Sequence, residues 1–104
     1  MNKINSVKKD IYLPNKIINA IIANHLSGYE YRVLLYLMSQ LYDSIPRKKF
    51  KKIKQLEIAN LLGIQKTHIS RTIKYLIEKN IVLRNNNLYS IQENTAFWKW
   101  NKNK

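Results

Sequence analysis

The apolar residues of this chain recur in stretches with helical spacing, which predicts a mainly α-helical protein. Residues 14–24 carry one stripe of isoleucines that ends near Asn24, and Pro14 suits the first turn of a helix. The stripe consists of Ile17, Ile18, Ile21 and Ile22. Residues 28–43 are apolar on most sides, so the helix predicted there must be covered by neighbours on several faces. We expect it to be the central helix of the core.

The start of that central helix carries a capping signal. Ser27 and Glu30 stand in the Ser-x-x-Glu arrangement, in which each side chain accepts a hydrogen bond from the backbone of the other residue. Tyrosines within the helix offer rings that stack on bases. At helical spacing, however, packing in the core is the favoured interpretation.

Residues 56–79 predict two helices joined by a tight turn at Gly63, where a helix end favours a left-handed residue. Apolar residues of the first helix are Leu56, Ile58, Ala59, Leu61 and Leu62. On the second, about Gln65 to Lys79, one arc holds Ile69, Ile73, Leu76 and Ile77. The opposite arc holds Thr67, His68, Arg71, Lys74, Tyr75 and Glu78. This polar, mainly basic face is typical of a helix that enters a DNA groove, although an ordinary helical hairpin has the same apolar spacing.

The next segment indicates which kind of helix-turn-helix this is. Asn80 is a suitable left-handed helix end, and residues 81–84 and 88–91 read as two short strands around residues 85–87. All three turn residues are asparagines, which tolerate the positive φ of hairpin turns. The predicted fold class is therefore mainly α with a small β-hairpin wing, a single-domain winged helix-turn-helix.

Length and composition set the class of protein. The 104 residues suit one domain, and the absence of cysteine excludes disulfides, thiol catalysis and cysteine zinc sites. No apolar run is long enough for a membrane span, and the first residues do not open a signal peptide, so we expect a cytoplasmic protein. We divide the chain into a flexible arm (1–10), the DNA-binding domain (11–100) and a basic tail (101–104).

The charge is strongly positive and unevenly distributed. Nineteen basic and six acidic residues give a net charge of +13, which suits a polyanionic partner. Residues 1–46 hold five basic and three acidic residues, a net charge of +2, whereas residues 47–104 hold fourteen and three, a net charge of +11. A genome rich in A and T inflates lysine everywhere, but it does not concentrate the surplus in the half that carries the helix-turn-helix.

A basic segment leads into the helix-turn-helix, with six basic residues among residues 47–54. We assign its lysines to backbone phosphates, with a solvated loop as the alternative. These lysines are Lys48, Lys49, Lys51, Lys52 and Lys54. Phe50 and Ile53 are expected to touch the core from a short strand that pairs with the wing. Lys54 stands where a capping Ser, Thr or Asp is expected. A cation beside a helix N-terminus is mildly unfavourable, and a nearby phosphate would offset this cost. A helix that begins one residue later is the alternative.

Catalysis is not expected. The six carboxylates are dispersed along the chain, whereas a metal-dependent nuclease gathers several around its ions. Only His25 and His68 are available as imidazoles, and neither has an evident partner. With only Gly28 and Gly63, the chain has no glycine-rich phosphate loop. We therefore expect no enzyme activity, no metal and no cofactor.

About residues 11–100 resemble the N-terminal domain of phage replication protein O. The segments that carry the resemblance are IYLPNKIINAII, LSGYEYRVLLYLM, the basic segment, IANLLGIQKTHISRTIKYLIEKNIV and NTAFWKW. The resemblance implies a winged helix that binds repeated sites in double-stranded DNA at a replication origin, as a homodimer. In that family a further C-terminal region recruits the helicase machinery. The sequence ends at Lys104, so we expect this chain to lack that region.

Likeness to winged-helix recognition helices also implies roles for individual residues. Arg71 stands where such helices send an arginine to guanine O6 and N7. The first turn, nearest the bases or their phosphates, holds Gln65, Lys66 and Thr67. Ser70 and Lys74 flank the groove, Arg84 and Asn86 reach from the wing, and His68 and Tyr75 are weaker candidates. Alternatively, each is an exposed polar residue without such a role.

An aromatic tail follows the wing. We expect Phe97, Trp98 and Trp100 to pack across the domain and close the core, with a dimer contact as the alternative.

Together these features favour a sequence-specific binder of double-stranded DNA at the replication origin of a phage or plasmid-like mobile element. A transcriptional repressor with the same fold is the alternative within DNA binding. A protein–protein adaptor belongs to a different class, and the basic bias disfavours it.

Overall fold

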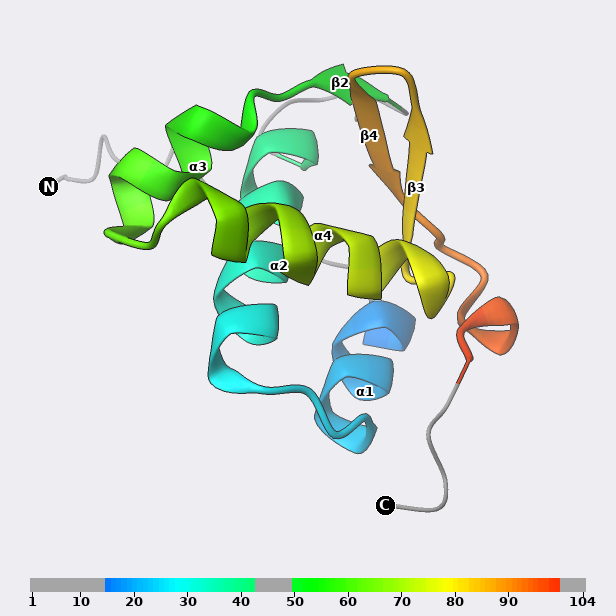
Figure 1. Ribbon diagram of the computed structural model, residues 1–104. Helices are drawn as coiled ribbons and strands as arrows, with labels where there is room; N and C mark the ends of the chain where they lie inside the picture. Colours follow the sequence, from blue (N-terminus) through cyan, green and yellow to red (C-terminus); the bar gives the residue numbers. More distant parts are fainter. Residues whose placement is uncertain (1–14, 43–49, 100–104) are drawn as a thin grey trace, which may run out of the picture.

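The computed structural model describes residues 15–42 and 50–99 of the chain. Its helices are α1 (Asn15–Ala23), α2 (Gly28–Leu41), α3 (Gln55–Leu62), α4 (Lys66–Glu78) and the short 3-10 helix η2 (Thr95–Phe97). Its strands are β2 (Lys51–Lys52), β3 (Val82–Asn85) and β4 (Leu88–Ile91). This order, helix-turn-helix followed by a hairpin, confirms the predicted mainly α, winged-helix fold (Figure 1). The predicted arm (1–10) and tail (101–104) lie outside the described residues.

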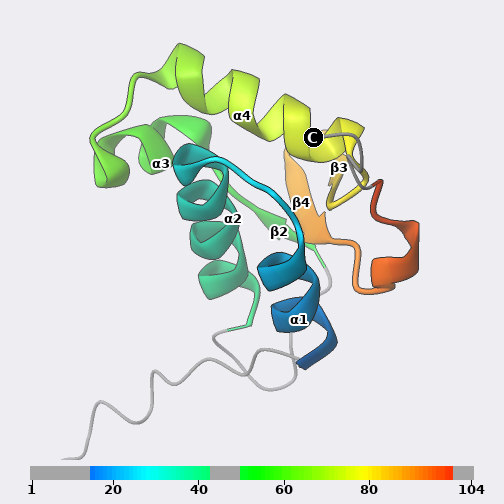
Figure 2. The same cartoon turned by 90° about the horizontal axis from the view of Figure 1, so that it is seen from below.

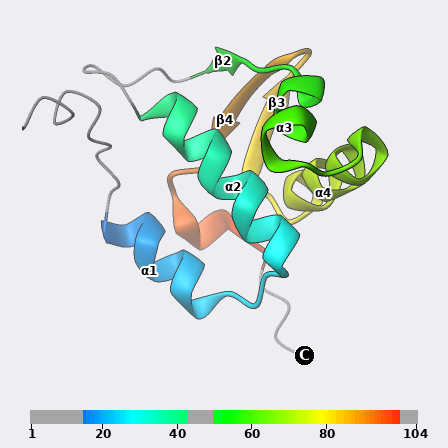
Figure 3. The same cartoon turned by 90° about the vertical axis from the view of Figure 1, so that its left-hand side faces the viewer.

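Helix α2 is the centre of the domain, as its apolar sequence predicts. It lies between α1 and α4 (Figures 2 and 3) and also contacts α3 and β4. Its buried residues are Val33, Leu34, Leu37, Met38 and Leu41. The capping box is confirmed: the Ser27 N–H donates to Glu30 Oε1 at 2.8 Å, and the Glu30 N–H donates to Ser27 Oγ at 3.2 Å. Helix α2 thus begins at a defined residue, and it packs against α4.

Helix α1 departs from the predicted stripe. Ile17 and Ala20 are buried, whereas Ile22 is 73% exposed. The stripe is narrower than the spacing suggests, because Ile17 and Ala20 are the residues of this nine-residue helix that are buried. Tyr31 of α2 holds its end, since the hydroxyl donates to the carbonyl of Asn24 at 2.9 Å.

The sheet has the order β2-β4-β3 and is antiparallel throughout. In it Lys51 pairs with Tyr89, and Asn85 pairs with Leu88 across the two-residue turn. This confirms the expected strand in the basic segment that joins the wing. Ile53 is buried as expected, but the core contact expected of Phe50 is wrong, because its ring is 37% exposed. Both strands of the hairpin were placed within one residue of their observed positions, and Asn86 adopts the predicted left-handed conformation with φ 59°.

The aromatic tail closes the domain through Trp98, which is only 2% exposed. Its indole Nε1 donates to the carbonyl of Gln92 at 2.7 Å, so the buried N–H is satisfied. Asn80 ends the α4 region with φ 60°, and its side chain donates to the carbonyl of Phe97 at 3.0 Å. The closing role is therefore observed for Trp98, but the packing expected of Phe97 is wrong, because its ring is 57% exposed. Trp100 lies outside the described residues.

Trp98 and its neighbour Phe97 form a matched pair for a stability test. We expect Trp98→Ala to lower the free energy of unfolding by about 3–5 kcal/mol, because it removes a buried indole from the core. Phe97→Ala should change it by less than about 0.5 kcal/mol, since this ring is 57% exposed. Urea unfolding followed by circular dichroism measures both. Equal effects of the two substitutions would contradict the closing role.

Candidate nucleic-acid interface

The turn between α3 and α4 fixes the direction in which α4 leaves the core. Gly63 ends α3 in the left-handed region with φ 69°, as predicted. The next residue, Ile64, is buried, and its N–H donates to the carbonyl of Ala59 at 3.1 Å. Gln65 then starts α4 without a side-chain cap. Buried Ile64 thus anchors the start of α4 to the core, and Gln65, Lys66 and Thr67 of its first turn are exposed.

The buried side of α4 determines what its other side presents. Ile69, Ile73 and Leu76 are each at most 1% exposed, and α4 contacts α2, α3 and β3. The hydroxyl of Thr72 donates to the carbonyl of His68 within the helix, so this buried polar group is satisfied. Four residues of the predicted polar arc, Thr67, Arg71, Lys74 and Glu78, are exposed, whereas His68 and Tyr75 are half-buried. The candidates Gln65, Lys66 and Ser70 are exposed as well. These exposed candidates lie on both sides of α4: Lys66 faces the wing, and Arg71 and Lys74 face α2.

Ser70 is linked to the wing by a residue that the sequence analysis did not select. Its hydroxyl donates to Gln55 Oε1, and Gln55 Nε2 donates to the hydroxyl of Tyr89 at 3.0 Å. One half-buried glutamine therefore joins α4, α3 and β4. The Ser70 proton is used in this network, which leaves its oxygen as an acceptor. No local signal distinguishes Gln55 from any polar residue in the first turn of a helix.

The wing arginine is held in place before any ligand binds. Arg84 Nε donates to the carbonyl of Asn86 at 2.6 Å, and the guanidinium lies over the Tyr89 ring, 5.6 Å from its centroid. The Nη groups of Arg84 remain as donors. Asn86 is exposed at the turn, and its left-handed backbone explains the residue type there.

The basic segment divides into inward and outward lysines. Lys51 is half-buried, and its Nζ donates to Gln40 Oε1 at 3.3 Å, so it is directed toward α2. Lys52 and Lys54 are exposed, as expected for alternation along an extended strand. Lys54 occupies the N-cap of α3 without a side-chain hydrogen bond, the position that the sequence marked as unusual. The remaining candidates, Lys48 and Lys49, lie outside the described residues.

Two grooves flank α4, and their charges differ. The wing-side groove, about 370 Å³, lies between the wing, the start of α3 and the first residue of α4. It is lined by the cations Lys52, Lys54, Lys66 and Arg84, with no carboxylate. The α2-side groove, about 450 Å³, is lined by Arg71 and Lys74 but also by the carboxylates Glu30 and Glu78. The positive potential is therefore concentrated on the wing side.

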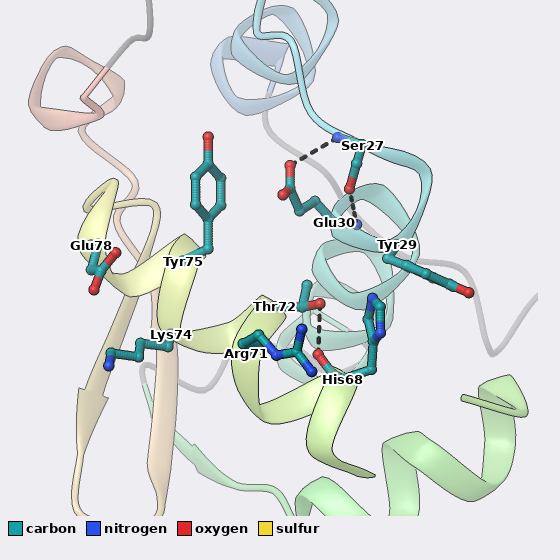
Figure 4. A pocket seen from close by; sticks show the side chains of 9 residues that line it. All are labelled: Ser27, Tyr29, Glu30, His68, Arg71, Thr72, Lys74, Tyr75 and Glu78. Carbon is teal, nitrogen blue, oxygen red and sulfur yellow. Dashed lines mark hydrogen bonds between the residues drawn. The ribbon is translucent and has the colours of Figure 1, made fainter. Parts of the chain in front are cut away.

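The weaker candidates belong to the α2-side groove (Figure 4). The ring of His68 packs edge-on against Tyr29, with centroids 4.3 Å apart, so this imidazole supports the contact between α2 and α4. Tyr75 is half-buried and has the ammonium of Lys79 above its ring, 5.5 Å from the centroid. Figure 4 shows Lys74 and Glu78 directed away from α2, on the outer side of the helix.

A sequence model of the family described as bacteriophage replication protein O matches residues 8–100, which include every described element. The chain belongs to the bacteriophage replication protein O family. This confirms the resemblance found in the sequence, and the family supports a role in phage replication. No curated protein and no solved structure matches the chain with significant similarity. Across residues 15–42 and 50–99 of this replication protein O relative, no helix has the length and apolar character needed to cross a membrane.

The two glycines of the chain allow a direct test of the turn that directs α4. We expect Gly63→Ala to destabilise the protein by roughly 1–2 kcal/mol, because its φ of 69° is unfavourable for a residue with a Cβ. A Cβ there meets nothing within 4 Å, so the cost arises from the backbone and not from a clash. Gly63→Asn should recover part of the loss, since asparagine tolerates this conformation.

Gly28 is the control for that test. It is the first residue of α2, has an ordinary φ and also leaves open space for a Cβ. Gly28→Ala should therefore stabilise the protein by about 0.4–1 kcal/mol. Thermal unfolding of the three variants measures these differences. A neutral Gly63→Ala would mean that the turn does not require the left-handed conformation.

Proposed function

We propose that this chain is a sequence-specific binder of double-stranded DNA that acts at the replication origin of a phage or plasmid-like mobile element. The observation that carries the proposal is the exposed face of α4. Its first two turns present Lys66, Thr67, Ser70 and Arg71 without a carboxylate, while the buried face is fixed against α2. A helix held in this manner at the edge of a compact domain can enter a major groove. Membership of a phage replication family supports the biological role.

Base reading is assigned to the outermost side chains of α4. Arg71 is exposed, and no hydrogen bond or ion pair joins it to another described residue, so its guanidinium is available to guanine O6 and N7. Thr67 lies one turn earlier and is similarly exposed. Ser70 serves as an acceptor, because its proton is donated to Gln55. Glu78 limits the reading surface to the first part of the helix, since its carboxylate is repelled by phosphates.

Sequence-independent attraction is assigned to the surrounding cations. Lys74 lies on the outer side of α4. The exposed lysines Lys52 and Lys54 of the basic segment line the wing-side groove. Contacts of this kind position a protein on the duplex but do not select a sequence. A single α4 reads only a few base pairs, so we also propose that two protomers bind each site, with half-sites roughly 34–36 Å apart.

The biological role is tested by footprinting on the DNA that surrounds the gene for this chain. The proposal expects several clustered, repeated sites, because initiators assemble on arrays. One isolated site that overlaps a promoter would instead support the transcriptional repressor with the same fold.

The reading role of Arg71 is tested by substitution. We expect Arg71→Ala to weaken binding to the selected site by about 1–3 kcal/mol and to weaken binding to a scrambled duplex far less. Lys16→Ala is the control, because it removes the same charge from an exposed position on α1. Fluorescence anisotropy with both duplexes measures the ratio of affinities. An equal loss on both duplexes would assign Arg71 to a phosphate and leave specificity to Gln65, Thr67 or the wing.

A further inference from the structure

The wing-side groove gathers positive charge from three separate parts of the chain. Lys52 comes from β2, Lys66 from the start of α4, and Arg84 from β3. Lys54, at the N-cap of α3, completes the set. None of the residues that line the groove is acidic. Cations that share a groove without a counter-charge repel one another, and an anion of the ligand relieves that repulsion.

We propose that the wing-side groove holds one backbone phosphate of duplex DNA, on the strand that passes between the wing and the start of α4. This inference rests on the proposed function, and it specifies which groove of the protein contacts the DNA backbone. The α2-side groove does not qualify, because Glu30 and Glu78 offset the charges of Arg71 and Lys74 there.

Arg84 gives the groove a donor that is already oriented. Its Nε is fixed on the carbonyl of Asn86, and its planar group lies over Tyr89. The Nη groups are left to meet phosphate oxygens, a geometry that arginine matches better than lysine. Tyr89 is itself held by Gln55, so little conformational freedom is lost when the phosphate binds.

The same contacts connect the phosphate to the reading helix. Lys66 lines the groove and also begins α4, and Gln55 joins Ser70 of α4 to Tyr89 of the wing. A phosphate in the groove therefore sets how far α4 enters the major groove. Gln55 is a positioning residue in this arrangement, since it acts through Tyr89 and Ser70.

The test combines groove variants with duplexes that carry one neutral methylphosphonate linkage at each backbone position in turn. The site is first selected from random duplexes with the chain of residues 1–104. Wild type, Lys66→Ala, Arg84→Lys and the control Lys16→Ala are then titrated against each duplex. Lys66 is exposed and has no partner among the described residues, so its substitution leaves the fold intact. Arg84→Lys keeps the charge but removes the planar fork.

We expect one linkage whose neutralisation weakens wild type and Lys16→Ala severalfold but causes a clearly smaller further loss in Lys66→Ala and Arg84→Lys. The slope of log K against log salt should fall by at most about one for Lys66→Ala, because Lys66 is one of several cations around the same phosphate. Gln55→Leu should reduce the ratio of selected to scrambled affinity, because it removes both hydrogen bonds that join Ser70 to Tyr89.

The contrary outcomes are distinct. If wild type binds the selected duplex while every methylphosphonate linkage weakens Lys66→Ala and Arg84→Lys as much as wild type, the groove holds no phosphate. The inference is then wrong, but the proposed function stands. If inorganic phosphate at constant ionic strength perturbs the NMR signals of Lys66 and Arg84 while the linkages remain uncoupled, the groove is a site for free phosphate and the inference is wrong. If no duplex is bound at low salt, both the proposed function and this inference fail.

Discussion

The packing of α4 against α2 is the constraint on which the rest of the surface depends. Ile69, Ile73 and Leu76 are almost completely buried. Burial of this stripe permits only one orientation of α4 about its own axis. Turning α4 by one residue, about 100°, would bury charged side chains and expose this stripe. Burial of an unpaired charge costs several kcal/mol, on the order of the whole stability of a small domain. The core therefore fixes which side chains of α4 face outward.

A second constraint comes from the two-residue strand β2. It pairs with β4 and so attaches the basic segment to the wing, where Lys51 and Lys52 necessarily point to opposite sides. Lys51 turns inward to Gln40, and Lys52 turns outward to the groove. The backbone of Ile53 continues this attachment, since its N–H donates to the carbonyl of Asn87 at 3.4 Å. Neighbouring lysines of similar sequence context thus have different surroundings.

Local signals were sufficient for the elements and for most of their ends. Gly63, Asn80 and the capping box at Ser27 act within one turn of the chain, so residue type alone indicated the backbone there. The apolar spacing of α4 likewise predicted the exposure of Thr67, Arg71, Lys74 and Glu78, but His68 and Tyr75 of the same arc are half-buried. In α1 the same reasoning failed for Ile22, because burial depends on whether a neighbouring element lies above the residue.

The candidate site was less predictable wherever it depends on contacts between distant segments. Gln55 contacts residues that are 15 and 34 positions away in the sequence, so its role becomes visible only in the folded chain. The contacts that orient Arg84, to Asn86 and Tyr89, are local to the wing, but the groove that Arg84 shares with Lys66 becomes visible only in the folded chain. The basic run supplies Lys52 and Lys54, but the sheet order brings Arg84 beside them, and the start of α4 adds Lys66.

An NMR titration of the full chain with a short duplex tests the central claim most directly. The account predicts that backbone shifts concentrate at the first two turns of α4, at residues 52–55 and at residues 84–87, while α1 and η2 remain unchanged. This pattern should persist at low salt with a duplex of arbitrary sequence, because much of the attraction is to phosphates. Shifts concentrated on α1 and the exposed ring of Phe97, with α4 unaffected, would contradict the account.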